Sequence, residues 1–253
     1  RLRRAWERAL LGLPAVSVTE EGARQLRVFG ANPSVIPHAA VVPTEAPPHR
    51  PRGNDAPTVL YAGRLVEEKG IRDLVEAARI VQSHGCAVRW EFAGDGPLRK
   101  FLQDQARHLP FCVLGHLGAD ELRQAYRRSD LLVLPSYRGV SGWEELFGIV
   151  VIEAYAEGLP VVATDCVGPR EIVEDGVTGR LVRQRKPTEL AAAILETLAD
   201  PKALEAMSEN ARRRAQERYA VEVVSAQWWD RIMISAERVR VKSPRRAGAN
   251  RWS

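Results

Sequence analysis

The sequence has 253 residues, of which 45% are hydrophobic and 27% charged, so it holds enough apolar material for a folded core. No apolar run approaches the roughly 18 residues that a membrane-spanning helix needs, and we expect no such helix. The cysteines Cys86, Cys112 and Cys166 lack the spacing of a disulfide framework or a zinc site, which favours a reduced, cytoplasmic setting. Arg1 rather than Met begins the sequence, so we expect a piece of a longer protein.

The net charge of +5 is concentrated at the two ends of the chain. Residues 1–52 carry +4 and residues 235–253 carry +5, whereas residues 53–234 carry −4. Basic ends favour peripheral contact with anionic lipids at the inner face of a membrane, or contact with nucleic acid. An arginine-rich proteome would explain them without any partner. The acidic middle argues against a nucleic-acid groove, so we expect no nucleic-acid partner.

The elements predicted near the start of the chain form a small piece of their own. Periodicity predicts helices at 1–11 and 20–29 and strands at 15–19 and 34–37. Five prolines and one glycine then lie between Ala40 and Pro57 without periodicity, which is typical of an extended linker. We therefore expect four parts: a remnant of a preceding domain at 1–43, a linker at 44–57, the main domain at 58–220, and a carboxy-terminal helix with a basic tail at 221–253.

From Thr58 onward, strand and helix patterns alternate. The predicted strands are 58–62, 88–93, 111–114, 130–134, 160–164 and 180–182, and the predicted helices are 70–84, 97–108, 119–128, 148–157, 169–174, 187–199, 201–217 and 221–239. Strands separated by helices require right-handed crossovers, which predicts an α/β fold with a doubly wound, Rossmann-like parallel sheet. Ligands of such sheets bind outside the carboxyl ends of the strands, and each motif described below follows one of these ends.

The stretch from Asp130 to Gly158 joins a buried strand to a buried helix through a polar loop. Residues 149–156 are apolar on every face except at Glu153, where an ionised carboxylate without hydrogen-bond donors would cost several kcal/mol. Glu145 precedes Glu153 by eight residues, so the pair could bracket a ligand the size of a sugar nucleotide. Alternatively, Glu153 caps nearby backbone and Glu145 is an ordinary solvated residue.

The run Glu145-Leu146-Phe147-Gly148, followed after four residues by Glu153-Ala154, closely resembles the glutamate-x7-glutamate signature of family-4 glycosyltransferases. Those are retaining enzymes of the GT-B architecture, in which two Rossmann-like domains face a cleft. The loop 137–144 is longer here than is common in the family, and it offers both Glu144 and Glu145 as the glutamate that faces the site. The register with Phe147-Gly148 favours Glu145.

A second motif, Gly63-Arg64 followed by Lys69-Gly70, comes after the first strand of the main domain. The planar fork of Arg64 and the mobile ammonium of Lys69 can converge on one anion, although a solvated charged loop has the same composition. The family resemblance implies that these two cations hold the diphosphate of the donor.

Two glycine-rich turns and one helix start complete the set of motifs. The turn Gly94-Asp95-Gly96-Pro97 resembles one that lines the nucleotide pocket in the family, and the backbone near Leu117 resembles a loop that meets the base. Glu171, in the first turn of a helix that Pro169 opens, resembles a glutamate near the donor sugar. Ordinary turn and helix-entry chemistry would also explain Gly94, Gly96 and Glu171.

The resemblance thus implies the donor-binding part of a hexosyltransferase-type glycosyltransferase that takes its sugar, with retention, from a nucleoside-diphosphate sugar. No metal cofactor is expected, because Arg64, Lys69 and a helix dipole supply positive charge. The implied catalytic residues are Glu145, Arg64 and Lys69, and the implied donor-binding residues are Gly63, Arg64, Lys69, Gly94, Gly96, Leu117, Phe147, Gly148 and Glu153.

Other features of the function stay open. The acceptor, whether saccharide, lipid or small molecule, is not specified by the sequence. Two alternatives are a non-catalytic nucleotide-sugar binding module and a GT-B epimerase or hydrolase of sugar nucleotides. We expect the isolated chain to bind a nucleoside diphosphate and to transfer little sugar without a complete acceptor domain.

Overall fold

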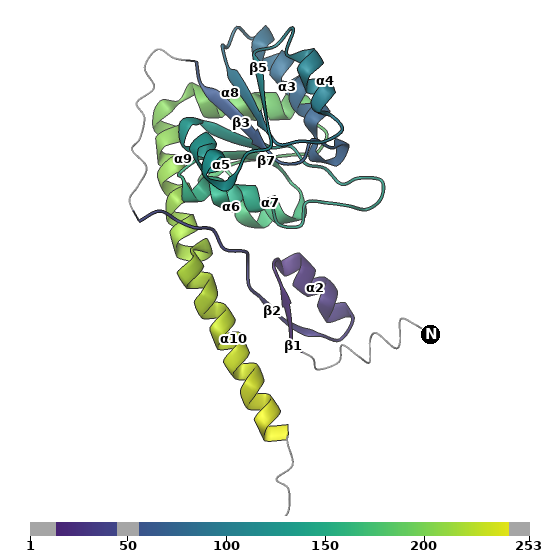
Figure 1. The fold of residues 1–253 in the computed structure, drawn as a ribbon, viewed down its shortest axis with the longest axis vertical. Coiled ribbons are helices and arrows are strands. Elements are labelled where there is room, and N and C mark those ends of the chain that lie inside the picture. The colour runs from purple at the N-terminus through teal and green to yellow at the C-terminus, as the bar shows by residue number, and fades with distance from the viewer. Residues whose placement is uncertain (1–13, 45–55, 243–253) are drawn as a thin grey trace, which may run out of the picture.

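The computed structural model describes residues 14–44 and 56–242 (Figure 1). The predicted helix at 1–11, residues 45–55 of the predicted linker and the basic tail beyond Lys242 lie outside the described residues. No helix in the described ranges is long and apolar enough to cross a membrane.

The main domain is built on a parallel sheet of six strands in the order β5-β4-β3-β6-β7-β8. The strands are β3 (Thr58–Ala62), β4 (Arg89–Ala93), β5 (Phe111–Gly115), β6 (Leu131–Leu134), β7 (Val161–Thr164) and β8 (Gly179–Val182). Every residue of β3, β6 and β7 is buried, which explains their unbroken apolar sequences. The predicted doubly wound sheet is confirmed. The strand order changes direction between β3 and β6, which makes this the switch point where such folds bind ligands.

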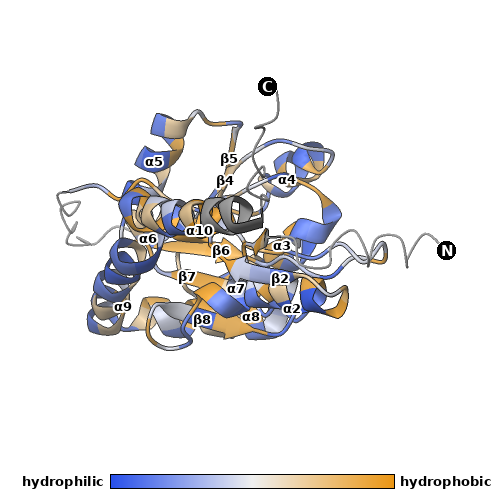
Figure 2. Ribbon diagram, turned by 90° about the horizontal axis from the view of Figure 1, so that it is seen from below, coloured by the Kyte–Doolittle hydropathy of each residue, from blue (hydrophilic) through white to orange (hydrophobic). Residues whose placement is uncertain are grey.

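Helices cover both faces of this sheet. The helices of the main domain are α3 (Ile71–Ser83), α4 (Arg99–Gln105), α5 (Ala119–Arg128), α6 (Ile149–Ala156), α7 (Val167–Ile172), α8 (Pro187–Ala199) and α9 (Pro201–Arg214), and α10 (Val221–Lys242) extends away from them (Figure 1). Successive strand residues point to opposite faces, so Leu132 packs in the cluster with α6 whereas Leu131 packs in the cluster with α3 and α8. Figure 2 shows the apolar strands β6 and β7 lying between these helices.

The small amino-terminal piece consists of β1 (Pro14–Ser17) and β2 (Asn32–Val35), which pair in parallel, and α2 (Glu20–Val28). Thr19 caps α2 by accepting a hydrogen bond from the Gly22 amide at 3.2 Å. The chain returns from β2 to the main domain, where the Ala40 amide donates to the Tyr219 carbonyl at 2.7 Å. Helix α10 runs beside the small piece (Figure 1).

Most predicted helices differ from the structure at one or both ends, and three of the differences have a clear local cause. Helix α4 begins at Arg99 rather than 97, because Gly96 to Leu98 form a turn in which the Leu98 amide donates to the Leu65 carbonyl at 3.0 Å. Helix α7 begins at Val167, so Pro169 is its third residue. Amides in the first turn have no partner within the helix, so a proline costs no helical hydrogen bond there. Helix α9 ends at Arg214, and a π-helical turn over Ala215–Tyr219 continues the chain toward α10.

Candidate functional site

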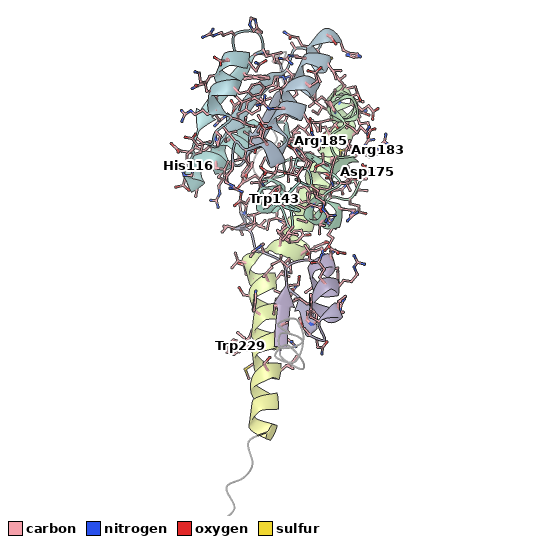
Figure 3. The ribbon with its side chains drawn as sticks, turned by 90° about the vertical axis from the view of Figure 1, so that its right-hand side faces the viewer. His116, Trp143, Asp175, Arg183, Arg185 and Trp229 are labelled. Atoms are coloured by element: carbon pink, nitrogen blue, oxygen red, sulfur yellow. The ribbon has the colours of Figure 1, made fainter. Side chains whose placement is uncertain are left out.

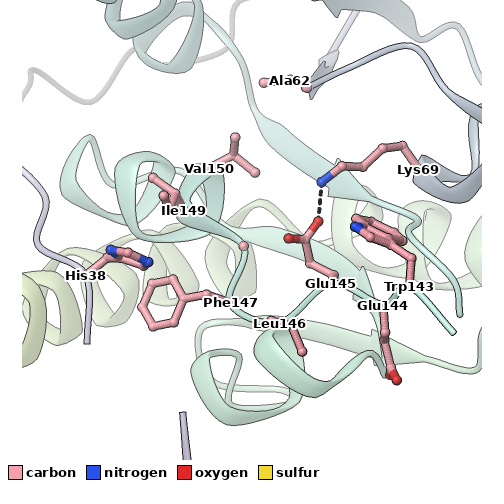
Figure 4. A pocket seen from close by; sticks show the side chains of 12 residues that line it. His38, Ala62, Lys69, Trp143, Glu144, Glu145, Leu146, Phe147, Ile149 and Val150 are labelled. Carbon is pink, nitrogen blue, oxygen red and sulfur yellow. Dashed lines mark hydrogen bonds and ion pairs between the residues drawn. The ribbon is translucent and has the colours of Figure 1, made fainter. Parts of the chain in front are cut away.

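A cavity of about 370 Å³ opens at the carboxyl ends of β3 and β6, the switch point of the sheet (Figure 4). This volume lies within the usual range for small-molecule sites. The lining residues come from the turns after both strands, the start of α6 and the segment after β2: His38, Ala62, Gly63, Lys69, Trp143, Glu144, Glu145, Leu146, Phe147, Gly148, Ile149 and Val150.

An ion pair between Lys69 and Glu145 occupies this cavity (Figure 4). Only 15% of the Lys69 side chain and 12% of the Glu145 side chain are exposed, and the Ser136 hydroxyl also donates to Glu145 at 3.4 Å. Gly70 brings Lys69 this close to β6, since its φ is +71° and a Cβ there would lie 1.9 Å from the Pro135 carbonyl oxygen. The pair therefore joins the two motifs that the sequence analysis singled out.

The two adjacent glutamates turn in different directions. The Glu144 carboxylate accepts a hydrogen bond from the Val167 amide at 3.2 Å, at the start of α7, whereas Glu145 faces Lys69. The Glu145 carbonyl in turn accepts from the Gly168 amide at 2.9 Å. Figure 4 shows the Glu144 carboxylate pointing away from the ion pair. Glu145 is thus the side chain presented to the cavity, and Glu144 fixes the loop to α7.

Tyr61 holds the turn that carries Gly63 and Arg64. Its hydroxyl donates to the Arg64 carbonyl at 2.7 Å. Burial, and then the negative charge of Glu145, raise the pKa of Tyr61, while the Arg64 guanidinium acts in the opposite direction. Tyr61 therefore stays a donor at neutral pH. Arg64 itself is exposed and does not line the cavity, so the structure does not show the two cations converging on one point.

Glu153 lies one helical turn beyond Ile149 and Val150, on the same face of α6. Its carboxylate accepts a hydrogen bond from the Tyr126 hydroxyl of α5 at 3.0 Å. Burial raises the pKa of Glu153 above its ordinary 4.5, and the Tyr126 hydrogen bond offsets part of that rise. Glu153 does not itself line the cavity, and its carboxylate is held by Tyr126 one helical turn from the lining residues Ile149 and Val150.

Gly94, Gly96 and Leu117 do not line the cavity. Gly94 has φ +141°, its amide donates to the Gly115 carbonyl at 2.7 Å, and a Cβ there would lie 1.9 Å from the Gly63 carbonyl oxygen. A Cβ at Gly96 would lie 2.6 Å from the Leu65 carbonyl oxygen. Close packing between the turns after β3 and β4 accounts for both glycines, and their role in a nucleotide pocket stays a prediction.

Glu171 is engaged elsewhere in the molecule. Its two carboxylate oxygens accept hydrogen bonds from the Glu20 amide at 2.8 Å and the Glu21 amide at 3.0 Å, at the start of α2. The expectation of a glutamate near the donor sugar therefore has no support from its contacts.

Sequence reasoning missed three residues of this site. The His38 ring lies edge-on to Phe147 with 4.9 Å between centroids, the Lys69 ammonium lies 5.3 Å from the centroid of a Trp143 ring, and Tyr126 holds Glu153. His38 and Tyr126 lie far from the motifs in sequence and carry no local signal. Trp143 could have been found, because it is a large aromatic side chain in a loop of mostly small residues directly before Glu144-Glu145.

Comparison with known proteins identifies the family. Residues 44–214, more than half of the chain, match the family model described as glycosyl transferases group 1. The chain is 34% identical over 178 residues to the alpha-D-kanosaminyltransferase of Streptomyces kanamyceticus, covering 69% of this chain and 45% of that protein. It is 36% identical over 169 residues to the glycogen synthase of Mycobacterium tuberculosis, covering 65% and 39% respectively.

A solved structure agrees with these relatives in fold. The structure of Anabaena HepE in complex with UDP-glucose matches with a TM-score of 0.73 at 23% identity, over 93% of this chain and 67% of that chain. At this identity the match shows the fold alone. The chain spans less than half the length of the two curated relatives. By its sequence and its fold, this chain belongs to the group 1 glycosyltransferases.

Proposed function

We propose that this chain is the donor-binding part of a family-4 glycosyltransferase that transfers a hexosyl group from a nucleoside-diphosphate sugar with retention of configuration. The observation that carries the proposal is the Lys69–Glu145 ion pair in the cavity beside the start of α6. A UDP-glucose complex of the structurally similar HepE supports a sugar nucleotide as the ligand.

The ion pair explains how the two charges are accommodated without a ligand and how the site would accept a donor. A buried ammonium without a partner would be costly, and Glu145 supplies that partner. When a diphosphate enters, Lys69 exchanges Glu145 for phosphate oxygens, and the first amides of α6 add the positive end of the helix dipole. Glu145 is then free to accept hydrogen bonds from donor-sugar hydroxyls and to stabilise positive charge at the anomeric carbon as the bond to phosphate breaks.

The other predicted residues take supporting roles in this proposal. Arg64, an exposed residue next to Gly63 of the cavity lining, neutralises the diphosphate from the solvent side, and Glu153 accepts hydrogen bonds from the ribose hydroxyls. We propose that no metal is required, because Lys69, Arg64 and the α6 amides supply the positive charge.

A non-catalytic sugar-nucleotide module, or an epimerase or hydrolase of sugar nucleotides, would use the same cavity. Analysis of products by NMR, with the anomeric configuration of the released sugar, separates these outcomes.

Substitution of Lys69 tests the assignment of the diphosphate site. Lys69→Ala should weaken binding of whichever of UDP, GDP or ADP binds the chain by about 1.5 to 3 kcal/mol, the value of a charge-assisted hydrogen bond. Glu145→Gln should leave diphosphate affinity equal or higher, because it releases Lys69. Titration calorimetry measures both, with Lys202→Ala on α9 as a control that should have no effect. Unchanged affinity in Lys69→Ala would remove the diphosphate assignment.

A contact with anionic lipid is a separate proposal for the carboxy-terminal part. Helix α10 exposes Trp228, Trp229, Ile232 and Met233, and residues 235–253, where the helix ends and the chain continues, carry +5. Aromatic and apolar side chains beside basic residues suit the surface of an anionic bilayer, so we propose a cytoplasmic protein at the inner face of the membrane. Co-sedimentation with phosphatidylserine vesicles, absent with phosphatidylcholine alone, tests this.

A further inference from the structure

Trp143 lines the cavity and belongs to a loop that the main domain holds in place. The loop 137–144 joins the end of β6 to Glu145. Both ends are held by the main domain: the Tyr137 amide donates to the Glu68 carbonyl at 2.9 Å, and Glu144 accepts from the Val167 amide. The loop is therefore attached to the main domain at both ends.

The tip of this loop closes on itself. The Gly139 amide donates to the Trp143 carbonyl at 2.8 Å, and the Gly142 amide donates to the Gly139 carbonyl at 2.9 Å. Gly142 has φ +82°, which favours glycine at the tip. The Arg138 amide also donates to the Gln184 side chain at 2.7 Å, beyond β8. These hydrogen bonds fix the backbone that carries Trp143, and a preformed site loses less entropy on binding.

The Trp143 side chain lies beside the ion pair, half-buried, with the Lys69 ammonium 5.3 Å from a ring centroid (Figure 4). A cation in that position shows that the electron-rich face of the indole is turned toward the cavity. If Lys69 turns to a diphosphate, this face becomes available to another group that carries partial positive charge. The C–H groups on one face of a pyranose are such a group, and they are apolar enough to bury against an indole.

We propose that Trp143 is a specificity-determining residue that packs against the C–H face of the donor sugar while Glu145 accepts hydrogen bonds from its hydroxyls. This rests on the proposed function of the cavity. An aromatic platform next to a carboxylate matches the two surfaces of a sugar, its apolar face and its polar edge. The loop thus recognises the transferred sugar, whereas Lys69 recognises the diphosphate that every donor shares.

The test compares a nucleoside diphosphate with the corresponding sugar nucleotide. Calorimetry on the whole chain uses the pairs UDP and UDP-glucose, GDP and GDP-mannose, and ADP and ADP-glucose, of which the tightest pair is carried forward. Trp143→Ala should weaken binding of the sugar nucleotide about fivefold to tenfold while diphosphate affinity changes less than twofold. Trp143→Phe, which keeps an aromatic face, should recover most of the loss. Trp229→Ala on α10, well away from the cavity (Figure 3), is the matched control.

Each outcome decides between this role and others. An equal loss for diphosphate and sugar nucleotide would show that Trp143 acts only by holding Lys69, and it would overturn the proposal. Unchanged affinity for both ligands in Trp143→Ala would also overturn it. If Trp143→Ala melts far below wild type, Trp143→Phe and Trp143→Leu are compared instead. A higher ratio of sugar-nucleotide affinity to diphosphate affinity in Trp143→Phe than in Trp143→Leu supports the proposal, and equal ratios overturn it. If wild type binds no diphosphate at all, the proposed function itself fails, which is a different result from the first two.

Discussion

Glu153 is the one carboxylate in a helix whose other side chains are apolar. Its role is either structural or to hold the ribose of the donor, and its contacts bear on this choice. The Tyr126 hydroxyl satisfies one oxygen at 3.0 Å, yet burial still raises the pKa of Glu153 above 4.5. The ionised form is therefore less favourable in the folded chain than in the unfolded chain. Folding stability should rise as the pH falls from neutral through the raised pKa, and the gain should level off below about 4.5, where both states are protonated.

The variant Glu153→Gln should lose this dependence on pH. At neutral pH its melting temperature without ligand should equal or exceed that of wild type, and the difference should shrink toward pH 4.5, the ordinary pKa of the group. If Glu153 holds the ribose, affinity for the ribonucleotide should fall by about 1 to 3 kcal/mol. Thermal melts across pH and calorimetry measure both effects.

The matched control is Glu157→Gln, at the end of the same helix. Glu157 forms ion pairs with Arg123 at 3.2 Å and Arg127 at 2.7 Å, so this variant should lower stability without changing nucleotide affinity. A Glu153→Gln variant that melts much lower than wild type and binds ribonucleotide normally would show that Glu153 is structural.

For single residues, the sequence predicted the charged residues of the site better than the residues that pack against them in space. Lys69 and Glu145 were predicted from motifs, and the structure brings them into one ion pair. Their neighbours His38 and Tyr126 reach the site only through the packing of separate elements, which no local pattern describes. Arg64 was predicted beside Lys69 because the two residues are close in sequence, but side-chain direction in a turn depends on contacts such as that of Tyr61.

Among the elements, α7 contacts the loop before α6, which forms part of the cavity wall. The Gly168 amide donates to the Glu145 carbonyl, and a Cβ on Gly168 would lie 2.3 Å from the Phe147 Cα and carbonyl oxygen. The absence of a side chain thus lets α7 pack on the backbone of Glu145 to Phe147. This contact also explains why α7 begins two residues before the predicted start, since backbone pairing with a distant loop is invisible to periodicity.

The variant Gly168→Ala should separate α7 from the loop. The added methyl group meets backbone rather than a flexible side chain, so we expect a loss of about 1 to 3 kcal/mol in the free energy of unfolding and weaker nucleotide binding. Urea denaturation and calorimetry would measure the two effects. The control is Gly118→Ala, where a Cβ would meet only Glu121 at 3.6 Å. Equal small effects in both variants would show that the α7 contact does not support the site.

In the whole molecule, the small amino-terminal piece is joined to the main domain by polar contacts. Arg212 donates to the Pro43 carbonyl at 2.6 Å and the Ala156 carbonyl at 3.1 Å, Arg231 donates to the Asn32 carbonyl at 3.3 Å, and Glu171 receives the first amides of α2. The sequence predicted the sheet of the main domain well, because each buried strand has its own apolar run. It did not predict these connections, since they join single residues that lie far apart in the chain.

Glu171 provides the test of how the two parts are held together. Its carboxylate complements the positive end of the α2 dipole, so Glu171→Ala should expose that end of the helix. Hydrogen exchange at residues 20–28 should become about twofold to fivefold faster, corresponding to the usual strength of such a contact, while exchange in β3 and β6 stays unchanged. Nucleotide affinity should also stay unchanged, because the carboxylate already accepts hydrogen bonds from α2.

Glu174→Ala, which removes a neighbouring ion pair with Arg214 at 3.1 Å, is the control that should leave α2 unaffected. If Glu171→Ala instead loses affinity for a sugar nucleotide and hydrogen exchange in α2 does not change, Glu171 has a role in binding the donor.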